Sequence, residues 1–382
     1  MTIGRDGRKA AQPVDTIAVW DRLIRLFHWS LVATVAVAMV SGFLLPENWL
    51  NLHLVAGAAI ALLLVLRLAW GIAGSSHARF SAFLYAPART LDYLRAHIGH
   101  RAPHYRGHNP LGALMVFALL AVLAALVLSG VIALGGVEKR GPLAFITSFA
   151  AGSVVRELHE ILAFALLGLV AAHVAGVVLS SLAERINLAG AMVTGRKPAL
   201  VPADHPRPAT ARTVPALAFV ALVGGVGAAG TMAFASLPGR GVPQAPLDPV
   251  YRTECGDCHI AFHPSLAGAA EWQSMLKGLD RHFGEDATLP PETVNRLATY
   301  LLANSATEYD TKAANWFRRR DPADPLRITA TPFWKRRHAG IDDGTFADLK
   351  VGARGACGAC HGDAGTGRFD DAAIAIPDLS KQ

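Results

Sequence analysis

The sequence predicts an all-α protein with a transmembrane four-helix bundle, a fifth tethering helix and a small helical domain outside the membrane. Of its 382 residues 52% are hydrophobic and 17% are charged, and the mean hydropathy of +0.33 is too high for an ordinary soluble protein. The character changes near residue 236: nineteen Lys and Arg stand against ten Asp and Glu before it, and seventeen against nineteen after it. We therefore expect a first part in lipid and a second part in water.

Five apolar segments are long enough to cross a hydrocarbon core of about 30 Å, which takes about 20 helical residues. They cover residues 26–45, 53–74, 111–134, 158–182 and 214–236. The fifth lies between two Pro-rich stretches, which are typical of extended spacers. These features predict a membrane domain at 1–200, a linker with the fifth helix at 201–249 and an extramembrane domain at 250–382.

Basic residues in the connections predict the orientation. The N-terminal arm and connections 75–110 and 183–213 contain five Lys or Arg each, whereas 46–52 contains none and 135–157 contains three. Because cytoplasmic loops are enriched in basic residues, we expect a cytoplasmic N-terminus and a periplasmic C-terminal domain at a bacterial inner membrane. A basic excess confined to such loops indicates contact with membrane lipid and no nucleic-acid partner.

All four cysteines lie in two Cys-x-x-Cys-His motifs. The motifs consist of Cys255, Cys258 and His259, and of Cys357, Cys360 and His361. This spacing is that of covalent c-type haem attachment, in which the cysteines hold the porphyrin and the histidine ligates iron. Two disulfides are the alternative, but such small loops remove little unfolded-state entropy. Attachment takes place outside the cytoplasmic membrane, which agrees with the orientation above.

Four histidines lie in or at the ends of the apolar segments: His28, His53, His159 and His173. Ionisable side chains at membrane depth are costly and usually functional. His159 and His173 are fourteen residues apart, which places them about 40° apart around one helix and about 21 Å apart along it. We therefore expect two non-covalent b-type haems, one ligated by His28 and His173, the other by His53 and His159. Interfacial histidines without a ligand are the alternative, with His28 as its strongest case.

The same spacing of fourteen singles out two more residues. Gly42 follows His28 and offers a surface without a side chain for haem packing. Arg67 follows His53 and is a candidate for contact with a haem propionate, the alternative being an arginine that extends to the interface.

The first part resembles the prokaryotic cytochrome b561 family, which includes the cytochrome b subunits of nickel–iron hydrogenases. The matching residues are Val-Trp-Asp-Arg at 19–22, Phe-His-Trp at 27–29, Ser-Gly at 41–42 and the two histidines of the fourth span. The resemblance covers roughly residues 16–200. It implies a four-helix, quinone-linked cytochrome with two haems.

The sixth ligands of the c-type haems are argued from helical spacing. In an expected helix at 269–283, His282 falls on the apolar stripe that includes Trp272 and Met275. We expect His282 to ligate iron, with Met275 as the rival. For the second haem His338 follows Phe333 and Trp334 at helical spacing, and His263 is the alternative.

Residues 250–382 are similar to the dihaem cytochrome c family. The similar stretches are 254–259, Trp272, 282–285, 300–304, 327–329 and 357–361. The resemblance implies histidine as the sixth ligand of both haems and favours His338 over His263. Each ligand is assigned to the attachment motif nearest in sequence, so that His282 pairs with His259 and His338 with His361.

Two groups of basic and histidine residues are less specific. The basic segments 318–320 and 335–337 are candidates for neutralising haem propionates or steering an acidic partner, and a solvated basic face is the alternative. The histidines of one cytoplasmic connection are expected at the surface, with weak metal binding as the alternative. They are His77, His97, His100, His104 and His108.

Together these features predict a membrane-bound electron-transfer protein with two b haems and two c haems. It carries electrons between the quinone pool and a periplasmic redox partner, with the ligands setting potential and geometry. One alternative is a periplasmic reductase or gas-binding cytochrome with an open c-haem position. Another is the membrane-anchor cytochrome b subunit of a hydrogenase-like complex.

Overall fold

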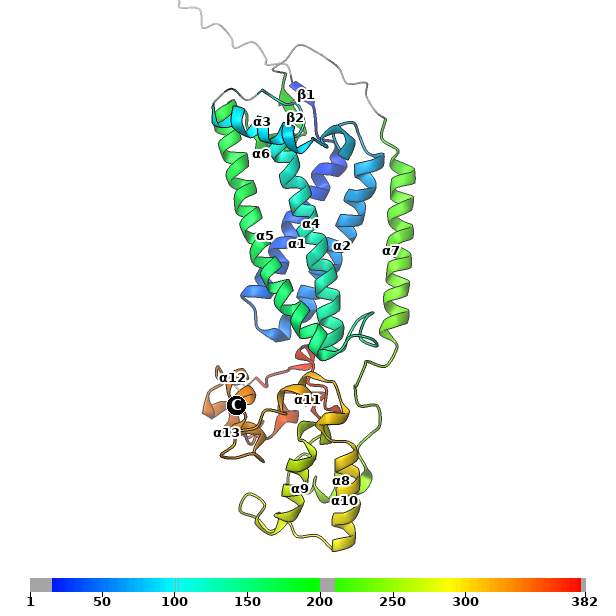
Figure 1. The fold of residues 1–382 in the computed structure, drawn as a ribbon, viewed down its shortest axis with the longest axis vertical. Helices are drawn as coiled ribbons and strands as arrows, with labels where there is room; N and C mark the ends of the chain where they lie inside the picture. Colours follow the sequence, from blue (N-terminus) through cyan, green and yellow to red (C-terminus); the bar gives the residue numbers. More distant parts are fainter. Residues whose placement is uncertain (1–15, 100, 102, 200–209, 379–382) are drawn as a thin grey trace, which may run out of the picture. The chain divides into compact units, whose positions relative to one another are not determined.

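The computed structural model describes residues 16–99, 101, 103–199 and 210–378, and it is mostly helical (Figure 1). The described residues form two compact units. Unit 1 comprises those of Met1–Ala36, Ala58–Ala125 and Leu162–Gly225, and unit 2 those of Val37–Gly57, Leu126–Ile161 and Val226–Gln382. Each long helix therefore contributes one part to each unit. The basic residues Arg5, Arg8 and Lys9 and three prolines of the first Pro-rich stretch lie outside the described residues.

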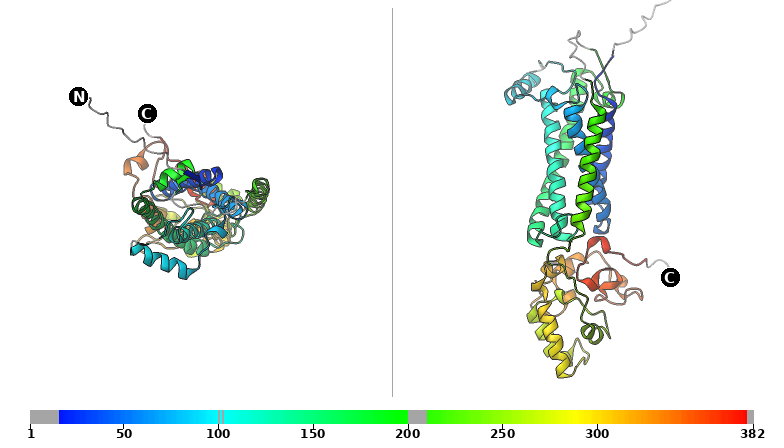
Figure 2. Two further views of the ribbon diagram at one scale, coloured as in Figure 1. Left: turned by 90° about the horizontal axis from the view of Figure 1, so that it is seen from above. Right: turned by 90° about the vertical axis from the view of Figure 1, so that its right-hand side faces the viewer.

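Among the described residues five helices are long and apolar enough to cross a membrane, which agrees with the predicted number of spans. They are α1 (Arg22–Phe43), α2 (Leu50–Ala73), α4 (Pro110–Ala133), α5 (Phe149–Glu184) and α7 (Thr213–Ala235). Helix α7 lies at the outside of the bundle (Figures 1 and 2). Its contacts include Ala216, which packs into the core of unit 1.

Helix α5 begins at Phe149, nine residues earlier than the expected 158. Arg156, Glu157 and Glu160 lie in exposed turns of this helix, and charged residues in an exposed turn do not end a helix. As a result, His159 lies inside α5 rather than at its start.

The start of α1 is fixed by Asp21. Its carboxylate accepts hydrogen bonds from the backbone N–H of Ile24 at 2.8 Å, the indole N–H of Trp70 at 2.9 Å and the hydroxyl of Ser75 at 2.6 Å. One side chain thus caps α1 and ties it to the end of α2. Val19, Trp20, Ile24 and Trp70 form the buried core beside it.

Short elements complete unit 1. Strand β1 (Thr16–Ala18) pairs antiparallel with β2 (Arg196–Pro198). Helix α3 (Pro87–Ile98) begins at a proline, and α6 (Leu188–Thr194) is capped by Asn187, whose side chain accepts from the N–H of Gly190. A 3-10 turn, η2 (Phe80–Ala82), follows α2.

In unit 2 the membrane helices are joined by two short elements. The 3-10 turn η1 (Glu47–Trp49) precedes α2, and the π-helical turn η3 (Leu134–Glu138) ends α4. At η3 the backbones of Gly136 and Gly152 are so close that a Cβ atom on Gly136 would lie 2.5 Å from the Cα of Gly152. The start of α5 therefore packs directly on η3.

The C-terminal segment, residues 249–378, consists of short helices and turns. The helices are α8 (Pro249–Glu254), α9 (Ala269–Lys277), α10 (Pro291–Ala303), α11 (Lys312–Trp316), α12 (Pro332–Arg337) and α13 (Asp343–Ala347). The 3-10 turns are η4 (Pro264–Leu266), η5 (Leu279–Arg281), η6 (Ala306–Glu308), η7 (Ile328–Ala330), η8 (Cys357–Ala359), η9 (Ala364–Thr366) and η10 (Asp371–Ala373). Side chains of Asp248, Thr311, Thr331 and Asp342 cap four of the helices.

Two hydrophobic clusters divide this segment into two lobes. The first contains Tyr251, Trp272 and Leu301, and Cys255 packs against it. The second contains Phe317, Trp334 and Phe346, and Ala359 of the second attachment motif packs against it. Each attachment motif therefore has its own core.

We expect Gly152→Ala to destabilise the protein by about 1–3 kcal/mol, because the added methyl group meets the backbone of Gly136. The matched control is Gly168→Ala on the same helix, where no atom lies within 4 Å of the new methyl group. The control should be neutral or slightly stabilising. Thermal unfolding of the detergent-solubilised chain measures both, and equal midpoints would contradict the close contact.

Candidate functional site

The eight histidines expected to ligate iron lie in four pairs. We call them site b1 (His28 and His173, ring centres 6.5 Å apart), site b2 (His53 and His159, 6.1 Å), site c1 (His259 and His282, 6.0 Å) and site c2 (His338 and His361, 6.2 Å). Metal–imidazole bonds are about 2 Å long, so two imidazoles on opposite sides of one iron have ring centres about 6 Å apart. All four pairs fit a haem iron ligated by two histidines.

The two histidines of site b2 are positioned by two Ser-Gly pairs. Ser41-Gly42 of α1 lies beside His53, and Ser129-Gly130 of α4 lies beside His159. The Nδ1 atom of His53 lies 3.0 Å from the carbonyl oxygen of Ala38 and 3.3 Å from the hydroxyl of Ser41. The Nδ1 atom of His159 lies 3.0 Å from the hydroxyl of Ser129. Oxygen partners at Nδ1 orient each ring and leave Nε2 to face a metal.

The glycines make room for these rings. A Cβ atom on Gly42 would lie 3.2 Å from Cε1 of His53, and one on Gly130 would lie 3.3 Å from Cε1 of His159. What lies against Gly42 in the structure is thus a histidine ring. Sequence reasoning missed Ser129 and Gly130, although the repeated Ser-Gly dipeptide in the first and third spans was a usable signal.

Site b1 has a different environment. The Nδ1 atom of His28 is buried and has no hydrogen-bond partner among the described residues. Its ring lies edge-on to Trp29, with centres 5.2 Å apart. Site b1 therefore has room for the iron but no Nδ1 acceptor for His28 in the described part of the chain.

Arg67 is buried and reaches the connection that follows α2. Its side chain is 4% exposed, donates to the carbonyl oxygen of Ala78 at 3.1 Å and places its guanidinium 4.5 Å from the ring centre of Phe80. These partners are uncharged, so the guanidinium keeps its charge available to an anion. Contact with a propionate stays a prediction.

The connection histidines are not all at the surface. His108 packs between Trp20 and Phe83, with ring centres 4.8 and 4.6 Å away, and burial lowers the pKa of His108 to about 3. The expectation of a surface residue was wrong here because the aromatic residues around it come from distant parts of the sequence. His97 stacks on Tyr93, and His100 lies outside the described residues.

Site c1 is formed by a turn rather than a helix. Helix α9 ends at Lys277, short of the expected 283, because Gly278 terminates it. Phe283 and Gly284 then take positive φ angles of 52° and 106°, which turn the chain so that His282 faces His259. A hollow of about 260 Å³ beside His282 is lined by residues including Met275.

Site c2 is tightly packed. The Nδ1 atom of His338 lies 2.9 Å from the carbonyl oxygen of Trp334, and the two rings stack with centres 4.4 Å apart. Burial lowers the pKa of His361 to about 4, which keeps its imidazole neutral, as ligation requires. The structure thus brings together the c-type histidines that are nearest in sequence.

His263, the alternative ligand, has a structural role. Its side chain is 3% exposed, and Nδ1 accepts a hydrogen bond from the backbone N–H of Ser265 at 3.2 Å and lies 2.8 Å from the hydroxyl of that residue. Burial lowers the pKa of His263 to about 4. The ring therefore caps η4 as a neutral acceptor.

The basic segments bind protein groups. Arg318 donates to the carbonyl oxygens of Ala306 and Tyr309, and Arg320 to that of Leu266. Lys335 pairs with Asp321 at 3.4 Å. Arg337 pairs with two carboxylates, Glu47 and Asp371. Four of the six basic residues thus have protein partners, and all of the six except Arg320 are exposed. None of the four cysteines, all of which lie among the described residues, forms a disulfide.

Comparison with known proteins assigns families to both parts. Residues 19–195 match the family described as prokaryotic cytochrome b561, and residues 251–369 the family described as dihaem cytochrome c. A probable Ni/Fe-hydrogenase B-type cytochrome subunit of Bradyrhizobium diazoefficiens is 22% identical over 214 residues, which are 48% of this chain and 86% of the relative.

Two solved structures are similar to the C-terminal segment. A diheme cytochrome c from Rhodobacter sphaeroides is 35% identical, over 32% of this chain and 96% of that chain, with a TM-score of 0.28. The diheme cytochrome of Shewanella baltica is 30% identical, over 35% of this chain and 95% of that chain, also with a TM-score of 0.28.

We expect Gly42→Val and Gly130→Val each to remove one of two b haems, because the new side chain displaces a histidine ring of site b2. The control is Gly57→Val on α2, where no atom lies within 4 Å of an added Cβ. Acid–acetone extraction followed by a pyridine haemochrome assay counts extractable and covalent haem. Full b-haem content in both variants would show that site b2 does not hold haem.

We expect His263→Ala to keep both c haems low-spin while lowering stability by about 2–5 kcal/mol, because the cap of η4 and the packing of a buried ring on Tyr309 are lost. His338→Ala should instead make one c haem high-spin. Visible spectra report the spin state, and a guanidinium titration followed in the haem absorption band reports stability. A high-spin haem in His263→Ala would make His263 the ligand.

Proposed function

Because the chain belongs to the prokaryotic cytochrome b561 family over residues 19–195 and to the dihaem cytochrome c family over residues 251–369, we propose that this membrane haem electron-transfer protein links the quinone pool to a periplasmic redox partner. The proposal rests on one observation above all. Four histidine pairs have the spacing for iron, two in the membrane helices and two beside the attachment motifs.

We assign two b haems to sites b1 and b2 and two c haems to sites c1 and c2. When bound, each haem supplies an iron that exchanges one electron between Fe³⁺ and Fe²⁺. The cysteines of the attachment motifs fix the c-type porphyrins covalently. The hydrogen bonds at Nδ1 of His53, His159 and His338 hold these rings in orientation and favour ligation through Nε2.

The orientation we propose places the N-terminus in the cytoplasm and the C-terminal segment in the periplasm. Two independent arguments support it: basic residues are concentrated in the N-terminal arm and in connections 75–110 and 183–213, and covalent haem attachment requires a location outside the cytoplasmic membrane. Site b2 then lies on the periplasmic side. Oxidation of a quinol releases two electrons and two protons, so two one-electron transfers remove the electrons.

A second candidate is a membrane-anchor subunit of a hydrogenase-like complex. The relative from Bradyrhizobium diazoefficiens, whose name is that of a probable hydrogenase subunit, favours it. The fused dihaem segment argues for the conduit, because it provides two further one-electron sites within the same chain. Copurification of a large enzyme partner would favour the anchor.

We expect a quinol, mixed rapidly with the purified full-length chain, to reduce b and c haems, and His159→Ala to block reduction of the c haems while site b1 is still reduced. The reason is that site b2 connects the membrane part to the C-terminal segment. Stopped-flow spectroscopy separates the b and c absorption bands. Reduction of the c haems at the wild-type rate in His159→Ala would contradict the conduit, and a spectral change on adding carbon monoxide to the reduced protein would favour an open-site cytochrome.

A further inference from the structure

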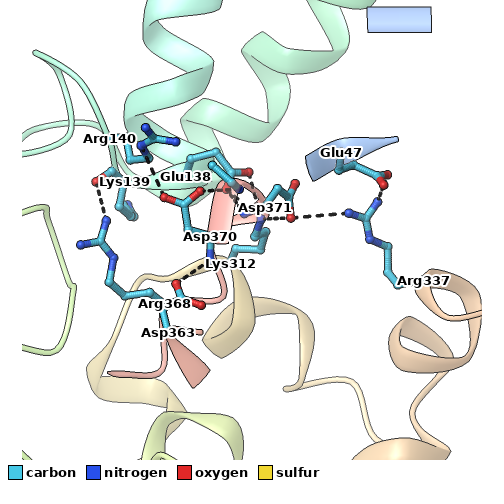
Figure 3. A network of polar contacts seen from close by, with 11 residues as sticks. Glu47, Glu138, Lys139, Arg140, Lys312, Arg337, Asp363, Arg368, Asp370 and Asp371 are labelled. Carbon is cyan, nitrogen blue, oxygen red and sulfur yellow. Dashed lines mark hydrogen bonds and ion pairs between the residues drawn. The ribbon is translucent and has the colours of Figure 1, made fainter. Parts of the chain in front are cut away.

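Within unit 2 the C-terminal segment is joined to the membrane connections by a network of ion pairs (Figure 3). We call it the junction network. Its members are Glu47, Glu138, Lys139, Arg140, Asp310, Lys312, Arg337, Asp370 and Asp371. The side chains from η1 and from the end of α4 point toward those from the C-terminal segment.

Two buried lysines lie at its centre. Lys312, at the start of α11, is 4% exposed, and its ammonium lies 2.8 and 3.0 Å from the carboxylate oxygens of Glu138 and 2.6 Å from Asp371. Lys139 is 2% exposed and lies 2.9 Å from Asp310. A buried ammonium without its partner is strongly destabilising, so the lysines disfavour a shifted contact in which they stay buried away from these carboxylates.

The chain that follows α7 is part of the same junction. The backbone N–H of Arg240 donates to the carbonyl oxygen of Ala144 at 2.8 Å, and that of Asp310 donates to the carbonyl oxygen of Gly241 at 2.8 Å. Gly241 has a positive φ of 63°, and a Cβ atom there would lie 2.5 Å from that of Asp310. Residues 239–242, between Pro238 and Pro243, are therefore bound on both sides and do not form the extended spacer predicted from the surrounding prolines.

The junction network is directly connected to site c2. Turn η10 carries Asp371, whose backbone N–H donates to Glu138 at 3.3 Å. Just after η10, the backbone N–H of Ala375 donates to the carbonyl oxygen of Cys360 at 2.8 Å, and Ile374 forms an antiparallel β-bridge with His361. The second attachment motif is thus tied to the turn that contacts the end of α4.

Arg337 makes a second connection to site c2. It precedes the ligand His338 and donates to Glu47 of η1 at 2.6 Å. Turn η1 ends four residues before His53 of site b2. The contacts to the membrane connections come from residues 310–371, in the lobe of site c2, whereas site c1 belongs to the lobe of α8, α9 and α10 (Figure 1).

We infer that the junction network holds site c2 against the end of the membrane helices that carry site b2, so that electrons pass between sites b2 and c2 first and reach site c1 last. With haem bound, each site would exchange one electron with the next, with no bond or proton changed. Site c1 then faces the external partner. Phe283, which follows the ligand His282, is 51% exposed and agrees with that role. The inference rests on the proposed function.

Docking is tested in the full-length chain with Lys312→Met, which removes the charge and keeps a similar length. The matched control is Lys335→Met, because Lys335 is 59% exposed and pairs with Asp321 within the C-terminal segment. We expect Lys312→Met to increase hydrogen exchange in residues 139–149 and to slow c-haem reduction by quinol at least tenfold. The control should match the wild type in both. Wild-type exchange and rate in Lys312→Met would overturn the docking.

The order of the sites is tested with His282→Ala and His338→Ala, in which both c haems stay covalently attached. Both variants should lose electron delivery to an external acceptor. They should differ in the rate at which quinol reduces the remaining six-coordinate c haem. In His282→Ala this is the haem of site c2, which should be reduced rapidly. In His338→Ala it is the haem of site c1, which should be reduced at least tenfold more slowly. The reverse pattern, or equal rates, would overturn the order. If quinol reduces no c haem in the wild type, the proposed function fails instead.

Discussion

An imidazole that ligates iron has to present one ring nitrogen to the metal. In a site with two histidines, the two rings are also held at a fixed distance from each other. The chain meets this constraint at four sites. Ring centres 6.0 to 6.5 Å apart recur in sites built from quite different elements. The membrane sites use histidines on separate long helices. The C-terminal sites use one histidine from an attachment motif and one from a turn or helix end.

The two environments hold the rings in different ways. In the membrane part, water does not satisfy a ring N–H, so the acceptors at site b2 come from the backbone of Ala38 and the hydroxyl of Ser129. Glycines beside them allow the helices to approach closely. In the C-terminal segment, capped short helices and stacking on Trp334 hold site c2. Small residues thus position the histidine rings of site b2, whereas aromatic packing positions those of site c2.

The features that were predictable from sequence are those with a local signature. Five spans, two attachment motifs and the intramembrane histidines follow from hydropathy, spacing and the cost of ionisable groups in lipid. The end of α9 before His282 was missed because an apolar stripe continued past Gly278. His108 and the binding of Gly241 to Asp310 depend on segments far apart in the chain, which periodicity does not reveal.

The junction network was likewise not predictable from the sequence, because neither Glu138 nor Lys312 carries a local signal of its partner. Apolar residues of similar volume often stabilise a buried contact as well as an ion pair does, so its charges are better understood as a means of specifying geometry. Lys312 is satisfied only when Glu138 and Asp371 are both within reach, whereas an apolar patch tolerates sliding. Electron transfer slows steeply as two centres separate. A junction that selects one arrangement therefore suits an electron conduit better than a domain that swings on its linker.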